Sequence, residues 1–207
     1  MATVFSYGGK AITTNRLKGN GTEPLNAGWG LNPSTLTSAN TDTALFDPSP
    51  EAKVAGTSTQ QTTNASFPND TYQVVATITA SASRVIQEFG LFDTATAAPL
   101  TTLSAAITSS VQTTCSVTSA TGFPGSGTYY VQIDNEVISV TGGQGTTTWT
   151  IGRGQRGSTA AASHISGAFV VGGEACAGGN MFLKGDFSAI NLNSGDSIQF
   201  TAKAQYT

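Results

Sequence analysis

A strict alternation of apolar and polar residues constrains the fold of this chain more than any other feature. In "TYQVVATITASA" an apolar side chain falls at every second position from Tyr72 to Ile78. In "DSIQFTAKAQY" the same pattern runs from Ile198 to Tyr206. A period of two residues is typical of a β-strand with one buried and one solvated face. Both segments are therefore predicted to be strands.

Further strands are predicted in "RVIQEFGLF", "GNMFLKGDF" and "TYYVQIDNEVISV". In the last of these, Asp134 and Asn135 stand between two β-rich runs as a two-residue hairpin turn. Segments that resemble strands and helices do not alternate along the chain, so parallel βαβ units are not expected. The sequence predicts an all-β protein, a β-sandwich or barrel-like domain with at most one or two short helices.

Two segments are the candidates for helix. "GKAITTNRLKG" predicts a short helix that ends at Gly19, because glycine adopts the left-handed conformation at little cost. "DTALFDPSPEA" predicts a single turn, with Asp42 or Thr43 as its cap and Pro48 as its end.

The strand pattern is interrupted once in an informative way. If "EFGLFDTATA" (88–97) is joined directly to "GGNMFLKGDF" (178–187), the result is a hairpin with a polar, glycine-containing tip. Exposed hairpin tips tolerate insertions, because few contacts cross there. We therefore expect a discontinuous host domain, residues 1–98 plus 174–207, that carries a small inserted β-domain, residues 99–173.

The composition narrows the class of partner. Charged residues make up 10% of the 207 residues, against a usual value of about 25%, and the formal net charge is −3. A surface this poor in charge suits proteins that pack against other subunits. Lys and Arg form no cluster, which argues against a direct nucleic-acid partner.

The chain also lacks the marks of export and of membrane insertion. The N-terminal "MATVFSYGGK" does not resemble a secretory signal, and no run of about 20 apolar residues predicts a membrane span. Cys115 and Cys176 are expected to be reduced thiols rather than a disulfide.

A literal G-x-G-x-x-G occurs at Gly152, Gly154 and Gly157. A dinucleotide fingerprint requires a following helix, on whose N-terminus the pyrophosphate sits. Here the chain instead returns to Gly167 and continues as an apolar, strand-like run. The motif is interpreted as a turn, and no cofactor-binding residue is assigned.

The candidate catalytic residues are few. His164 is the only histidine, which excludes metal sites built on a histidine pair, and it is interpreted as a polar loop or strand-edge residue. Paired acids for glycoside chemistry could come from Asp186 and Asp196 or from Glu88 and Asp93. We interpret Asp196 as a turn residue, and Asp47 and Asp93, which both follow Leu-Phe, as caps of turns. No catalytic or metal-binding residue is assigned, and the protein is predicted not to be an enzyme.

Aromatic side chains offer one alternative, a carbohydrate platform. Stacking on sugars needs exposed rings, whereas strand aromatics more often belong to the core. The candidates are Trp29, Trp149, Tyr129, Tyr130 and Tyr206.

The chain resembles a family of small β-proteins in three segments. These are the hairpin quoted above, its continuation "SAINLNSGDSIQFTAKAQY" and the N-terminal "GKAITTNRLKGNGTEPLNAGWGLNP". Members of this family are encoded among the virion structural genes of tailed bacteriophages. The segment "FPGSGTYYVQIDNEVISVTGGQGTTTWTIGRGQRGSTAAASHISGAFVV" resembles a mobile module of phage structural proteins. The resemblance covers most of the chain and carries no catalytic residues.

The resemblance implies a virion structural protein, with the capsid surface as its expected location after synthesis in the bacterial host cytoplasm. A capsid decoration or cement protein, bound to the major capsid protein as a homo-oligomer such as a trimer, is the main hypothesis. The alternatives are a tail, baseplate or fibre-attachment protein whose insert contacts a host surface glycan, and a glycan hydrolase. No membrane partner and no cofactor are expected.

Overall fold

The fold is described by a computed structural model, which covers residues 2–17, 19–32, 36–66 and 68–206. Within these residues the regular structure is almost entirely β-strand, with one α-helix, α1 (Tyr7–Leu17). No helix among them is long and apolar enough to cross a membrane. The prediction of an all-β fold with at most one or two short helices is confirmed.

The first of three sheets has five strands in the order β1-β13-β6-β2-β3. Its strands are β1 (Ala2–Phe5), β13 (Met181–Leu192), β6 (Arg84–Phe92), β2 (Asn26–Gly30) and β3 (Val54–Ala55). The second sheet has three strands in the order β14-β5-β4. They are β14 (Ser197–Gln205), β5 (Thr71–Thr79) and β4 (Thr57–Gln61).

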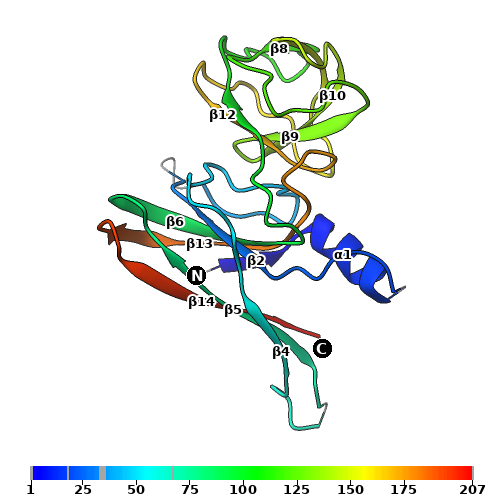
Figure 1. Cartoon of the computed structure of the whole chain (residues 1–207). Helices are drawn as coiled ribbons and strands as arrows, with labels where there is room; N and C mark the ends of the chain where they lie inside the picture. Colours follow the sequence, from blue (N-terminus) through cyan, green and yellow to red (C-terminus); the bar gives the residue numbers. More distant parts are fainter. Residues whose placement is uncertain (1, 18, 33–35, 67, 207) are drawn as a thin grey trace.

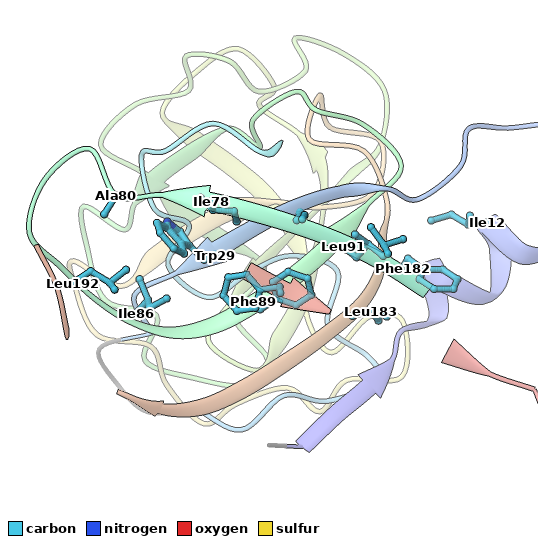
Figure 2. Packing of buried hydrophobic residues seen from close by; sticks show 14 residues of the cluster. Ile12, Trp29, Ile78, Ala80, Ile86, Phe89, Leu91, Phe182, Leu183 and Leu192 are labelled. Atoms are coloured by element: carbon cyan, nitrogen blue, oxygen red, sulfur yellow. The ribbon is translucent and has the colours of Figure 1, made fainter. Parts of the chain in front are cut away.

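These two sheets pack face to face and enclose one core, and together they are called the sandwich below (Figure 1). The alternation in the sequence sets the inward faces: Val74, Ala76 and Ile78 of β5 are all buried. They form one cluster with Trp29 and Phe89 of the opposite sheet, and Figure 2 shows Ile78 in the same cluster as these two rings. Phe89 also stacks on Phe200 of β14, with ring centroids 4.5 Å apart.

The third sheet has six strands, all from residues 100–172, in the order β7-β12-β9-β10-β11-β8. They are β7 (Leu100–Thr102), β12 (Phe169–Gly172), β9 (Tyr129–Ile133), β10 (Glu136–Gly142), β11 (Thr148–Gly152) and β8 (Thr114–Ser116). Thr118 N donates to Thr102 O and Ser104 N to Ser116 O, each at 2.9 Å. These bonds join the two outer strands, so the sheet closes into a small barrel with its own core around Trp149.

The barrel leaves the sandwich between β6 and β13 (Figure 1). These two strands are antiparallel, with Phe92 opposite Met181 and Leu91 opposite Leu183. The predicted pairing of the two flanking segments is therefore confirmed. The predicted two-residue turn at Asp134 and Asn135 is also present, and it connects β9 to β10.

The two helix predictions have different outcomes. Helix α1 is present and is followed by Gly19 at a φ of 81°, as expected. The turn predicted in "DTALFDPSPEA" is wrong, since residues 42–52 contain no helix. The backbone N–H groups of Thr43 and Ala44 donate to the Gln132 side chain, and that of Phe46 donates to Glu88. Glu88 thus accepts the Phe46 N–H that a helical turn starting at Asp42 would direct to Asp42 O.

Candidate functional site

His164 lies in the barrel with both ring nitrogens bonded to carboxylates. Its Nδ1 is 2.7 Å from Asp134 Oδ2, and its Nε2 is 2.9 Å from Glu136 Oε2. An ionised carboxylate only accepts hydrogen bonds, so both nitrogens donate and the ring is an imidazolium. A general base needs a ring nitrogen with a free lone pair. His164 therefore acts as an ion-paired structural group, and its backbone bonds to Ile107 agree with the expected strand-edge position.

Glu136 is the centre of this barrel cluster, which consists of Glu136, Arg153, His164 and Asp134. The Arg153 guanidinium donates to both Glu136 oxygens at 2.7 Å. The backbone amide of Gly154 donates to Glu136 Oε1 at 2.8 Å, and that of Ala161 to Oε2 at 3.0 Å. The Gly154 N–H that a bound phosphate would need is therefore occupied by the protein's own carboxylate.

The remaining geometry of the glycine motif is also that of a turn. Gly154 and Gly157 have φ values of 60° and 83°, in the left-handed region that glycine adopts readily. In the segment after Gly157, residues 158–168 contain no helix. A pyrophosphate would find no helix N-terminus here, so the interpretation as a turn agrees with the structure.

The cluster shifts the pKa values of its members in opposite directions. Burial favours the neutral form of Glu136, but its bonds to His164, Arg153 and two backbone amides outweigh this and lower its pKa to about 2. Burial likewise opposes the charge on His164, yet the bonds to Asp134 and Glu136 raise its pKa above the ordinary value of 6.5. Both shifts stabilise the ionised cluster.

A second cluster, called the boundary cluster, lies between the sandwich and the barrel. It consists of Lys184, Asp42, Glu88 and Gln132. Lys184 Nζ, fully buried on β13, lies 3.2 Å from Asp42 Oδ2 and 3.3 Å from Glu88 Oε2. It also donates to Ala44 O at 3.1 Å. Burial raises the pKa of Asp42 despite the nearby Lys184 charge.

Gln132 brings the barrel into the boundary cluster. Its Oε1 accepts the backbone N–H groups of Thr43 and Ala44 at 2.8 and 2.9 Å. Its Nε2 donates to Asp42 Oδ1 at 2.9 Å and to Asp134 O at 3.0 Å. Gln132 belongs to β9, whereas its Asp42, Thr43 and Ala44 partners belong to a loop that packs on the sandwich. One amide side chain thus fixes the barrel to that loop.

Lys53 holds the two chain segments that connect sandwich and barrel. Its Nζ donates to Gly178 O at 2.7 Å and to Thr96 O at 2.9 Å, and it lies 3.7 Å from the centre of the Phe92 ring. Burial lowers the pKa of Lys53 to about 8, although the charge of Asp93 acts in the opposite direction.

In the structure the acids of both proposed glycosidase pairs are bonded to other groups. Asp186 accepts the backbone N–H of Ser38, whereas Asp196 accepts that of Asn193 in the turn before β14, as predicted. Glu88 is bonded to Lys184 and to backbone amides. Asp93 accepts Asn180 N at 2.8 Å, so it ties the two segments next to Lys53. The prediction that Asp47 and Asp93 cap turns is wrong, because Asp93 bonds to this distant residue and, among the described residues, the Asp47 carboxylate accepts no hydrogen bond.

The candidate carbohydrate platform is not formed. Trp29, Trp149 and Tyr129 are buried in two different cores. The ring of Tyr130 is covered by the Arg156 guanidinium at 4.0 Å, which leaves Tyr206 as a half-exposed ring. Trp29, Trp149 and Tyr129 thus belong to the cores, in line with the alternative weighed in the sequence, whereas Tyr130 and Tyr206 do not.

A surface poor in charge is the outward side of the three-stranded sheet, called the outer face. The registers place Thr59, Gln73 and Lys203 in one cross-strand row, with further rows of the same character on both sides. Lys203 is the only charged residue of the outer face. Its members are Thr57, Thr59, Gln61, Gln73, Val75, Thr77, Thr79, Ser197, Gln199, Thr201, Lys203 and Gln205.

Sequence reasoning missed the residues that organise both clusters. Lys184 had a signal, since it is a lone charge in the apolar "MFLKGDF", and such a lysine needs a buried partner. Gln132, Arg153 and Lys53 gave no local signal, because their partners lie far away in sequence or in irregular segments. Cys115 and Cys176 are free and buried, as expected for reduced thiols.

The comparisons with known proteins identify no family for this chain. Comparisons with protein-family models and with curated protein sequences found no match to the chain. In the part of the chain that the structure describes, no three His, Cys, Asp or Glu side chains are grouped as metal ligands.

Proposed function

We propose that this chain is a structural protein of a tailed bacteriophage virion, a capsid decoration or cement protein that binds and stabilises the major capsid lattice. The observation that carries the proposal is the outer face, a hydroxyl- and amide-rich sheet surface with one charge, Lys203. Such a surface forms many hydrogen bonds with a partner and desolvates few charges when it docks. The resemblance of the sequence to phage virion proteins supports the same function.

The internal chemistry supports a binding role rather than catalysis. The ionisable side chains with catalytic potential form hydrogen bonds and ion pairs with one another and with backbone groups. These side chains are His164, Glu136, Lys184 and Glu88. Buried networks of this kind fix one conformation. A rigid module with fixed surfaces suits repeated docking on a lattice, where many modest contacts add through multivalency.

We further propose that residues 99–173 form an inserted domain and that residues 1–98 and 174–207 carry most of the particle contacts. The supporting observations are the barrel's separate core and its exit between two paired strands. The boundary cluster limits this independence, since Gln132 satisfies backbone groups of the 42–44 loop.

The test is binding of purified protein to particles that lack it, followed by imaging of the labelled chain. We expect the label on the head lattice, binding that is weakened at least tenfold by Thr77→Glu on the outer face, and unchanged binding for Thr150→Glu on the exposed side of the barrel. A variant lacking residues 99–173 should still fold and attach. Label on the tail, or equal effects of the two charge substitutions, would contradict the proposal.

The alternative is a tail, baseplate or fibre-attachment protein with a host-contacting insert. It is favoured by the position of the barrel, which extends from the sandwich as a separate lobe (Figure 1). The same deletion separates the two functions. If attachment to the particle persists but adsorption to host cells is lost, the barrel is the host-contacting part.

A further inference from the structure

The barrel and the sandwich differ in whether their sheets have free edge strands. The barrel closes through the bonds between the Leu103 and Val117 segments and has no long free edge. In the sandwich the outer strands β1, β3 and β4 have four, two and five residues. The remaining outer strand, β14, has nine residues, Ser197–Gln205, and within the described residues its backbone pairs only with β5.

Long free edges are usually blunted by charged side chains, lysine above all, by proline, by bulges or by a short strand, because their unpaired N–H and C=O groups accept another strand. β14 contains no proline, and its nine residues pair with β5 without a register shift. Its one charged residue is Lys203, near the C-terminal end of the strand and on the outer face. The edge is therefore open to a partner strand that does not place a second cation opposite Lys203.

We propose that two copies of this chain pair through β14, antiparallel about a two-fold axis, so that their three-stranded sheets become one continuous six-stranded sheet. The proposal concerns the chain alone and goes beyond the virion function. The strand that pairs with this edge is β14 of a second copy. Two β14 strands can pair antiparallel with their inward and outward faces matched and without opposing like charges, as the allowed registers show.

The two faces of β14 restrict the register. Ile198, Phe200 and Ala202 face the core of the sandwich, whereas Gln199, Thr201 and Lys203 face outward. A register shift of one residue would pair inward with outward side chains, so only registers that match the faces are allowed.

Among these registers, one gives full overlap of all nine residues and places Thr201 opposite Thr201 of the partner subunit. In this register Lys203 lies opposite Gln199 of the partner subunit, and the like charges do not meet. A shift that centres the axis on Lys203 would oppose two ammonium groups, which is destabilising.

Cysteine cross-linking tests the register. Directly opposed residues of antiparallel strands have Cα atoms about 4.5–5.5 Å apart, a separation that a disulfide spans. We expect Thr201→Cys to form a disulfide-linked dimer under mild oxidation. Thr59→Cys is the matched control, since Thr59 is exposed on the same face but on the opposite outer strand, β4.

A pair of charge variants tests the same contact without cross-linking. Gln199→Glu places a carboxylate opposite Lys203 of the partner subunit twice per dimer, and Gln199→Lys places an ammonium there. Cross-strand charge pairs are worth up to about 1 kcal/mol each, and each dimer contains two of them, so the two variants should tighten and weaken the dimer by up to about thirtyfold relative to wild type. Within one subunit Gln199 lies opposite Thr77, so both variants should have similar stability as monomers.

Sedimentation equilibrium of the full chain measures these dissociation constants. The proposal predicts a wild-type dimer, tighter for Gln199→Glu and weaker for Gln199→Lys, and efficient cross-linking of Thr201→Cys alone. A wild-type protein that remains monomeric at its highest soluble concentration overturns it. So does cross-linking of Thr59→Cys at least as fast as that of Thr201→Cys, or an oligomer that responds equally to both charge variants.

Discussion

The two buried charge clusters are built from similar groups but are placed differently in the molecule. In the barrel cluster all members come from residues 134–164, and Glu136 is the shared acceptor of Arg153 and His164. In the boundary cluster Lys184 and Glu88 belong to the sandwich, Asp42 to a loop and Gln132 to the barrel. One cluster is local, and the other joins two regions.

This difference indicates what each cluster does for folding. A local cluster fixes an irregular segment, here residues 153–163, which has few apolar contacts of its own. A shared cluster instead makes the stability of one region depend on the other, because removal of either side leaves buried groups unpaired. We therefore expect substitutions in the barrel cluster to affect the barrel alone and those in the boundary cluster to affect the sandwich as well.

The chain offers a probe for each region, since Trp29 is buried in the sandwich core and Trp149 in the barrel core. The Trp149→Phe background leaves Trp29 as the fluorescent reporter of the sandwich, and Trp29→Phe leaves Trp149 as the reporter of the barrel. Denaturant unfolding in the two backgrounds then separates the two stabilities.

The largest effect is expected for Lys184→Met, which keeps the volume of the side chain but leaves Asp42 and Glu88 without their cation. Removal of one partner from a buried ion pair costs about 3–5 kcal/mol. The transition reported by Trp29 should lose that much, whereas Lys203→Met on the exposed face of β14 should change it by less than about 0.5 kcal/mol. A small loss for Lys184→Met would show that the cluster contributes little.

A slightly smaller loss is expected for Glu136→Gln, which leaves the Arg153 guanidinium buried beside a neutral amide. With the pKa of Glu136 lowered from 4.5 to about 2, its ionised form contributes about 3 kcal/mol at 1.36 kcal/mol per pKa unit. The loss should appear in the transition reported by Trp149 and not in that reported by Trp29. Equal losses in both would remove the distinction between a local and a shared cluster.

The same cluster predicts a pH profile for the barrel. The contribution of Glu136, whose folded pKa is lowered, is present above pH 4.5 and is lost as the pH falls toward 2. The pKa of His164 is raised in the folded protein. Its contribution is therefore complete below its ordinary pKa of 6.5 and is lost as the pH rises above 6.5 through the higher pKa of the folded state. Barrel stability should therefore be greatest between about pH 4.5 and 6.5, and Glu136→Gln should abolish the acidic decline.

Much of the fold could be predicted from the sequence, because alternation and turn chemistry are local signals. They predicted the strands around Tyr72 and Phe200, the turn at Asp134 and the pairing of β6 with β13. The clusters could not be predicted in the same way. The helical turn expected at residues 42–48 is absent because Glu88 accepts the Phe46 N–H that the turn would direct to Asp42 O, while Gln132, about ninety positions away, accepts the amides of Thr43 and Ala44. Long-range side-chain contacts of this kind leave no periodic pattern.

Gln132→Ala tests whether the boundary cluster couples the two regions. It leaves Thr43 N, Ala44 N and Asp42 Oδ1 without their barrel partner, and a buried unsatisfied group costs about 1–3 kcal/mol. We expect a loss of about 2–3 kcal/mol, shared between the transitions reported by Trp29 and Trp149. The control is Asn135→Ala, which removes an exposed bond to Thr37 O and should cost less than about 0.5 kcal/mol. A loss confined to Trp149 would mean that the barrel does not support the 42–44 loop.

Asp47 lies close to both the barrel cluster and the boundary cluster, but its carboxylate is bonded to neither. It is 6% exposed and lines a cavity of about 140 Å³ together with Asp134 and Phe169 of the barrel, and no hydrogen bond to its carboxylate is present among the described residues. Burial and the charge of Glu88 raise its pKa to about 6.

Because the pKa of Asp47 in the folded protein exceeds its ordinary value of 3.8, ionisation of this carboxyl is a cost to the folded state. The cost is absent below pH 3.8, grows as the pH rises toward 6 and is constant above that value. Asp47→Asn should therefore stabilise the protein above pH 6, by about 1–2 kcal/mol once the water that reaches the cavity is allowed for, and should match wild type below pH 3.8. Denaturant unfolding at pH 3.5 and pH 7.5 measures both limits, and the acidic limit serves as the internal control. If Asp47→Asn is destabilising at pH 7.5, the carboxylate has a cation after all, and the boundary cluster extends to Asp47. If it is stabilising as expected, the charge of Asp47 is a net cost to the folded protein that no cation near the boundary cluster offsets.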